Sequence, residues 1–387
     1  MLHFGIRVGG TQKKQINQSE IPRKPFTKGL FCVKIICISF FVEDGAVKVK
    51  LNANETYYRQ IVFSIGVAMV ALLLLMNVSG WLQDWFQNSI RESISDPIAA
   101  DVAEQLFYAG TYLLVFLLPA YLLRYSIRKR GLIYYPIKAE LRLSKYLPII
   151  LFGGVFLVWT QSYINGMLVS VFNYSAFSSD VLWEQQELQY NYQVMLRLLV
   201  AALVPAFCEE FLFRGAVLTN LLPFGRGPAI LISSLLFAVM HQNAEQVLYA
   251  FSAGVLLGLV YERTGSIWNC FFLHLANNFA SVLVEVMVWR LPFDNELIWV
   301  IMETSLCVIC IGCVVFLTFV LKRERPNAED GFFEKSTPSS DGYAAHPVSS
   351  SRAVQLFFNF PMILFLGSSV AQMISLIGMA WVYSYGA

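Results

Sequence analysis

The sequence predicts an all-α protein, a polytopic transmembrane bundle of about eight helices. Three observations support this fold class: 57% of the 387 residues are hydrophobic, only 14% are charged, and the apolar residues gather in runs long enough to cross a bilayer. A soluble domain carries about 25% charged residues. The formal net charge of +2 implies no nucleic-acid partner. The lipid bilayer is therefore the first expected partner.

Eight apolar runs are candidate membrane spans, and the fifth and sixth of them are short. They cover residues 61–81, 104–124, 147–172, 194–218, 228–241, 246–261, 266–289 and 297–321. Short membrane helices are tolerated where neighbouring helices bury them or where they line a wet cavity. Pro228 opens the fifth run, as proline does in a first helical turn.

Composition divides the chain into four parts. Residues 1–60 are a basic segment, 61–321 the eight-helix membrane domain, 322–353 a polar linker, and 354–387 a hydrophobic C-terminal segment. The last segment is either a ninth span or a helix on the membrane surface, and Pro361 is expected to break its start.

The distribution of basic residues predicts the orientation. Lys and Arg are concentrated in the N-terminal 60 residues, in the loop after the second run and after the eighth run, whereas the loops after the first and third runs are acidic. Because basic loops stay inside, we expect a cytoplasmic N-terminus and a tail that begins in the cytoplasm after the eighth span.

Polar and ionisable side chains interrupt the apolar runs at three places. Ionisable groups in hydrocarbon are costly and usually mark a functional site. Two of the four histidines of the chain lie at these places. The three motifs are Glu209-Glu210-x-x-x-Arg214, Phe237-x-x-x-His241 and His274-x-x-x-Asn278.

The first motif predicts two different roles for its glutamates. Residues four apart share a helix face, so Glu210 and Arg214 are expected to form a buried ion pair. Glu209 is rotated by about 100° from Glu210. With Phe213 four positions later, Glu209 is expected to be unpaired and free to act as a general base. Pro205 is expected to kink this helix toward a cavity.

The histidines and the asparagine supply the other groups that peptide hydrolysis needs. His274 and Asn278 share one helix face, where an imidazole can orient water or bind metal and an amide can donate to an oxyanion. His241 ends its short helix. The set suits water activation with oxyanion stabilisation. It equally suits a divalent metal such as zinc, with Glu209, His241 and His274 as the candidate ligands.

Each motif alone has an ordinary structural explanation. Glu-Glu-x-x-x-Arg is common on soluble helices, and a buried histidine is more often a satisfied core residue. The three motifs occur together in apolar surroundings, which favours a functional site. The His-Glu-x-x-His, Gly-x-Gly-Asp and Gly-x-Ser-x-Gly signatures of other proteases are missing from the sequence.

These motifs resemble those of the CPBP family, the CAAX-protease and bacteriocin-processing enzymes also called Abi. The segments Glu209-Glu210-Phe211-Leu212-Phe213-Arg214-Gly215 and Arg263-Thr264-Gly265-Ser266-Ile267-Trp268-Asn269 are also similar to the family's, and the specific resemblance covers about residues 194–289. It implies an eight-helix intramembrane endopeptidase with a cavity open to the cytoplasm. It further implies that Glu209 and His241 activate water, that His274 and Asn278 stabilise the oxyanion, and that Glu210 and Arg214 give structural support.

The resemblance leaves the cofactor and the substrate open. It fits both a catalytic zinc and a metal-free glutamate mechanism. The expected partner is a peptide or protein substrate at the membrane, and the expected location is a bacterial cell membrane. The alternative is a non-proteolytic scaffold or a bacteriocin self-immunity protein of the same fold. A proton-relaying transporter would show repeated halves with broken helices, which the sequence lacks.

Overall fold

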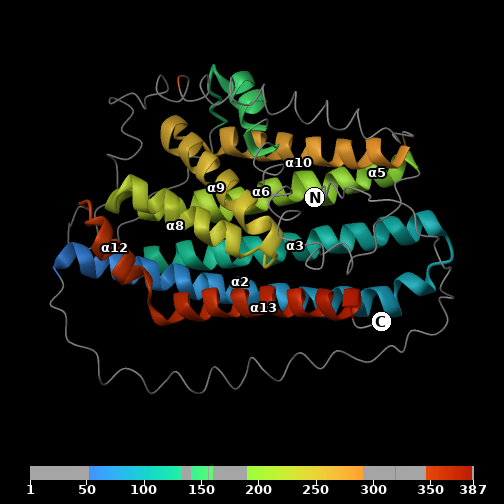
Figure 1. Cartoon of the computed structure of the whole chain (residues 1–387), viewed down its shortest axis with the longest axis horizontal. Helices are drawn as coiled ribbons and strands as arrows, with labels where there is room; N and C mark the ends of the chain where they lie inside the picture. Colours follow the sequence, from blue (N-terminus) through green and yellow to red (C-terminus); the bar gives the residue numbers. More distant parts are fainter. Residues whose placement is uncertain are drawn as a thin grey trace.

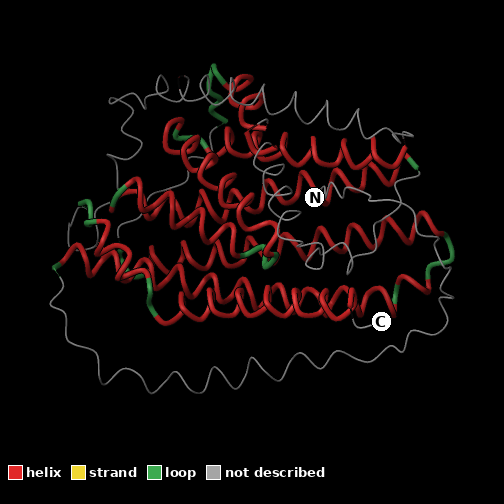
Figure 2. The backbone as a smooth tube through the Cα atoms, in the orientation of Figure 1, coloured by secondary structure: helices red, strands yellow, loops and turns green. Residues whose placement is uncertain are grey.

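A computed structural model describes residues 52–132, 141–155, 157–159, 190–290, 319 and 346–385. Every regular element in these ranges is a helix, so the predicted all-α bundle is confirmed (Figure 2). The N-terminal segment up to residue 51 lies outside the described residues. So do most of the eighth apolar run and the linker up to residue 345.

The first two helices are long and have clear N-terminal signals. Helix α2, Ala53–Ser89, begins with a capping box in which Asn52 and Glu55 each accept a hydrogen bond from the other's backbone N–H. Helix α3, Pro97–Lys129, begins with Asp96 as its cap and a proline in its first turn. Both helices extend well beyond the apolar runs that predicted them. They lie side by side along the length of the molecule (Figure 1).

The fourth apolar run forms a composite helix, here called the central helix, over residues 191–221. Its consecutive segments are α5 Asn191–Leu198, the π segment η5 Leu199–Leu203, α6 Val204–Glu210, the π segment η6 Phe211–Leu218 and α7 Thr219–Leu221. Pro205 is the second residue of α6, directly after η5. Proline has no backbone N–H, so one helical hydrogen bond is missing, and the wider π turn adjusts the backbone around this gap. The disturbance expected at Pro205 therefore takes the form of a π segment.

Three helices follow the central helix. They are α8 Arg226–Val239, α9 Ala244–Thr264 and α10 Ile267–Arg290. Helices α8 and α9 pack very closely at Gly254. A Cβ atom added there would lie only 3.0 Å from the Cα atom of Ser234. Small residues allow this approach, as they commonly do between membrane helices. The central helix lies between α3 and α10 (Figure 1).

The C-terminal segment forms two helices rather than one. Helix α12, Ser350–Phe357, begins within the stretch expected to be linker, and α13, Phe360–Tyr385, packs along α2 (Figure 1). The two meet at an angle of 73°. The expected break occurs just before Pro361, which itself lies in the first turn of α13, where proline is tolerated.

Several of these helices can cross a membrane. Judged by length and composition over the described ranges, three qualify: Ala53–Ser93, Pro97–Lys129 and Ile267–Val286. The bent pair α12 and α13 adds a fourth if it counts as one span. The chain is thus a multi-pass membrane protein.

Candidate functional site

Glu210, Arg214 and His274 form the buried centre of the site. Arg214 Nη1 donates to Glu210 Oε1 at 2.9 Å, which confirms the predicted pair between residues four apart. His274 Nδ1, on α10, lies 2.8 Å from the same oxygen. Glu210 and Arg214 are each 1% exposed, and His274 is 8% exposed. One carboxylate oxygen thus accepts from both a guanidinium and an imidazole, so Glu210 does more than order its own helix.

Arg214 is held in place by several neighbours. Its Nη2 donates to the carbonyl of Gly254 on α9 at 3.1 Å, and its guanidinium lies 4.7 Å from the centre of the Phe237 ring. Thr219, five residues on, donates its hydroxyl to the Arg214 carbonyl at 2.6 Å. These contacts tie the central helix to α8 and α9.

Glu209 has a partner that the motif does not contain. The hydroxyl of Tyr112, on α3, donates to Glu209 Oε1 at 2.5 Å. The expectation that Glu209 is unpaired is therefore wrong. The rule of residues four apart finds partners on one helix, whereas this partner lies on another. The second oxygen, Oε2, is buried without a hydrogen-bond partner, and it lies 3.9 Å from His274 Nε2.

His241 reaches the group through Phe237. Its Nδ1 lies 2.8 Å from the Phe237 carbonyl oxygen, which can only accept, so Nδ1 carries the proton. The Phe237 ring meets the imidazoles of His241 and His274 edge-on, at centroid distances of 5.1 and 5.9 Å. Because Nδ1 of His241 carries the proton, Nε2 is the acceptor in the neutral ring. Gln242 next to it adopts a positive φ of 55°, which turns the chain out of α8.

Asn278 is joined to the site by its neighbour. Asn277 Nδ2 donates to Asn278 Oδ1 at 3.3 Å and to the Tyr249 hydroxyl of α9 at 2.8 Å. Since the Oδ1 atom of Asn278 accepts this bond, its amide NH₂ group is left for other acceptors. Asn278 is half-buried, one turn beyond His274 on α10.

The three candidate metal ligands do not form a ligand set in this structure. Among the described residues, no three His, Cys, Asp or Glu side chains are grouped in a way that could hold a metal ion. Glu209, His241 and His274 are distributed over separate contacts, with Glu209 Oε1 taken by Tyr112 and His274 Nδ1 by Glu210. These residues as arranged do not fit a metal. The mechanism proposed for these residues therefore includes no metal ion.

Sequence reasoning missed three polar contributors to the site. They are Tyr112, Tyr249 and Asn277. The two tyrosines are among 18 in the chain and stand in no recognisable motif. Asn277, in contrast, directly precedes a candidate residue, and its amide inside an apolar run was a usable signal.

Comparisons with known proteins agree with the motifs. Residues 191–280 match the family described as type II CAAX prenyl endopeptidase Rce1-like. The "Putative membrane peptidase YdiL" of Bacillus subtilis (strain 168) is 31% identical over 97 residues. That alignment covers 24% of this chain and 38% of the relative, so the similarity spans well under half of either protein. No solved structure matches significantly. The segment that carries the glutamate pair, His241 and His274, residues 191–280, is therefore similar to type II CAAX prenyl endopeptidases, in agreement with the resemblance to the CPBP family that the motifs indicate.

Proposed function

We propose that this protein is an intramembrane endopeptidase of the CAAX-processing type. The observation that carries the proposal is the buried group of Glu209, Glu210 and His274, assembled from two helices within the family-matched segment. Buried charges without a function are rare in membrane helices. A buried carboxylate oxygen without a partner, next to an imidazole, has the composition of a water-activating site.

Glu209 Oε2 is the proposed general base. The 3.9 Å between Oε2 and His274 Nε2 is too long for a direct hydrogen bond, and a water beside this pair could bond to both atoms. The carboxylate takes a proton from that water as the oxygen attacks the peptide carbonyl. The same carboxylic acid then gives the proton to the leaving amine. Tyr112 occupies Oε1 and so leaves Oε2 for this exchange.

His274 and Asn278 are proposed to stabilise the oxyanion. Because Nδ1–H of His274 points to Glu210, Nε2 donates to the oxyanion when the ring carries both protons. The NH₂ group of Asn278 is the second proposed donor, with its orientation set by Asn277. The acceptor nitrogen of His241 is proposed to orient the water together with Glu209.

The test is Glu209→Gln in the purified full-length protein. Gln keeps the size and can still accept from Tyr112, but it cannot act as a base. Release of the C-terminal tripeptide from a farnesylated Cys-a-a-X peptide in liposomes should fall by roughly 10² or more. Glu285→Gln is the matched control, because it makes the same change on α10 at a half-buried pair with Arg197, outside the proposed site.

Three results would contradict the proposal or refine it. Cleavage by Glu209→Gln at a near-normal rate removes Glu209 from the mechanism and makes Glu210 the next candidate. A wild-type protein that cleaves the unprenylated peptide equally well is an endopeptidase without prenyl selectivity. A cellular phenotype that survives Glu209→Gln supports the scaffold or immunity alternative.

A further inference from the structure

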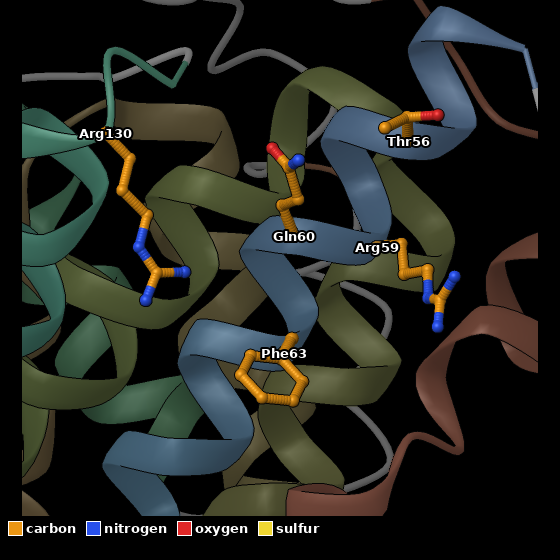
Figure 3. Close-up of a pocket in the computed structure, with 5 residues that line it drawn as sticks. All are labelled: Thr56, Arg59, Gln60, Phe63 and Arg130. Atoms are coloured by element: carbon orange, nitrogen blue, oxygen red, sulfur yellow. The ribbon is translucent and has the colours of Figure 1, made fainter. Parts of the chain in front are cut away.

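The basic end of the α2–α3 pair carries a groove that the catalytic proposal does not use. It has a volume of about 190 Å³ and is lined by Thr56, Arg59, Gln60, Phe63 and Arg130. Figure 3 shows the Arg130 guanidinium reaching from the end of α3 toward α2, which supplies the other four residues. No carboxylate lies among the lining residues.

Both arginines have unused hydrogen-bonding capacity. Arg130 Nη1 makes one long contact, 3.4 Å to the Ser64 hydroxyl, and Arg59 is exposed. Over the described ranges, neither arginine forms an ion pair with a carboxylate. Guanidinium groups bind phosphate through paired hydrogen bonds, and the Gln60 amide adds a neutral donor, whereas the Thr56 hydroxyl already donates to the Asn52 carbonyl. The groove is therefore chemically suited to a phosphate group.

The groove lies at the level of lipid headgroups. On α2, Trp81 and Trp85 are exposed, as is typical of residues at a membrane interface. Arg59 and Trp81 are 22 residues apart, or about 33 Å along a helix. The hydrocarbon core of a bilayer is about 30 Å thick. If the tryptophans mark one interface, Arg59 lies at the other.

An apolar path leads from the groove into the membrane. Phe63, Val67 and Leu74 are exposed and share one face of α2, since residues 4 and 11 positions apart differ by only about 40° and 20° around a helix. Arg59, one turn before Phe63, continues this face at its polar end. A ligand with a phosphate and an acyl chain can contact both the groove and the apolar face of α2, whereas free phosphate can contact only the groove.

We propose that this groove binds the headgroup of an anionic phospholipid, with one acyl chain along Phe63, Val67 and Leu74. Such a lipid would contact α2 and α3 at the same time. Its recognition depends on one arginine from each of two packed helices, and differs in this from the diffuse attraction of basic loops to anionic membranes.

The experiment measures lipid binding to the purified full-length protein in neutral detergent. Dioleoylphosphatidylglycerol is titrated and retained lipid is counted by native mass spectrometry, with dioleoylphosphatidylcholine and inorganic phosphate as separate arms. We expect retention of phosphatidylglycerol, little retention of phosphatidylcholine, and no competition by millimolar phosphate. The double variant Arg59→Gln/Arg130→Gln should bind phosphatidylglycerol at least about 10-fold more weakly.

The matched control is Arg128→Gln/Lys129→Gln, which removes two exposed charges at the same end of α3 without touching the groove. Equal loss in both double variants would show that only surface charge matters and would overturn the proposal. Full competition by inorganic phosphate would reduce the groove to an anion site and would overturn the lipid part. Should the groove variant not fold, a photoactivatable phosphatidylglycerol on the wild type decides: crosslinks outside residues 56–74 and 130 contradict the proposal.

Discussion

Replacing Tyr112 with Phe tests whether the α3 hydroxyl sets the reactive geometry of Glu209. The substitution removes one oxygen atom. The ring of Tyr112 stacks on Phe116 with centroids 4.6 Å apart and planes at 16°, and a phenylalanine ring can keep this packing. The change should therefore leave the contact between α3 and the central helix intact, and the protein should accumulate normally.

The expected loss follows from the bond that disappears. A hydrogen bond to a charged group contributes about 1.5–3 kcal/mol. The Tyr112–Glu209 bond is 2.5 Å long and reaches a carboxylate that is only 4% exposed, so water cannot readily replace it. If Tyr112 holds Glu209 for catalysis, kcat should fall by about 10- to 100-fold. KM should change little, because the hydroxyl contacts the base and not the proposed substrate site.

The assay is cleavage of the prenylated peptide across a range of pH, with Tyr108→Phe as the matched control. Tyr108 lies one turn earlier on α3, with its ring 5.9 Å from that of Tyr112, and has no described hydrogen bond to Glu209. The loss of the Tyr112 hydroxyl should also shift the pH dependence of kcat, whereas Tyr108→Phe should not. A Tyr112→Phe enzyme with wild-type kcat and an unchanged pH profile would refute this role for Tyr112. If Glu209→Gln still abolishes cleavage, only the role of Tyr112 is refuted; if Glu209→Gln is also active, the proposed function itself fails.

Four further outcomes are expected. Arg214→Ala should lower membrane abundance more than specific activity, because it leaves Glu210 buried without its guanidinium at a cost of about 3–5 kcal/mol; normal abundance with no activity would place Arg214 in the catalytic machinery. Gly254→Ala should destabilise the protein by about 1–3 kcal/mol in a thermal unfolding assay, whereas Gly227→Ala, with open space around it, should not. Chelation should leave cleavage unchanged, since the candidate ligands do not converge; recovery by added zinc after a loss would contradict this. A cysteine at Ser339 should resist impermeant reagent added outside intact cells, and labelling would reverse the predicted topology.

The parts of the site that lie on one helix could be predicted from the sequence. Glu210 and Arg214 are four apart, and helix geometry puts them on one face, where they pair at 2.9 Å even though Arg214 lies in a π segment. The apolar runs located most described helices for the same reason, since burial in hydrocarbon demands a continuous apolar stretch. Their ends were less predictable, because caps such as Asn52 lie outside the apolar run.

The contacts between helices could not be predicted in this way. Tyr112 precedes Glu209 by 97 positions, and their pairing depends on how α3 packs against the central helix. His274 meets Glu210 across 64 positions for the same kind of reason. No local periodicity contains this information. The charged residues in apolar runs predicted that a site exists, whereas the partner of each residue depends on how the helices pack.

Glu209 and Glu210 are adjacent in an α-helical turn, yet their side chains lie in different surroundings. They end α6, between the two π segments, where a step of one residue is a rotation of about 100°. Glu210 consequently faces Arg214 and His274, while Glu209 faces Tyr112. Yet His274 contacts Glu210 through Nδ1 and approaches Glu209 through Nε2. Because one imidazole lies between both carboxylates, the roles proposed for Glu209 and Glu210 are linked through His274.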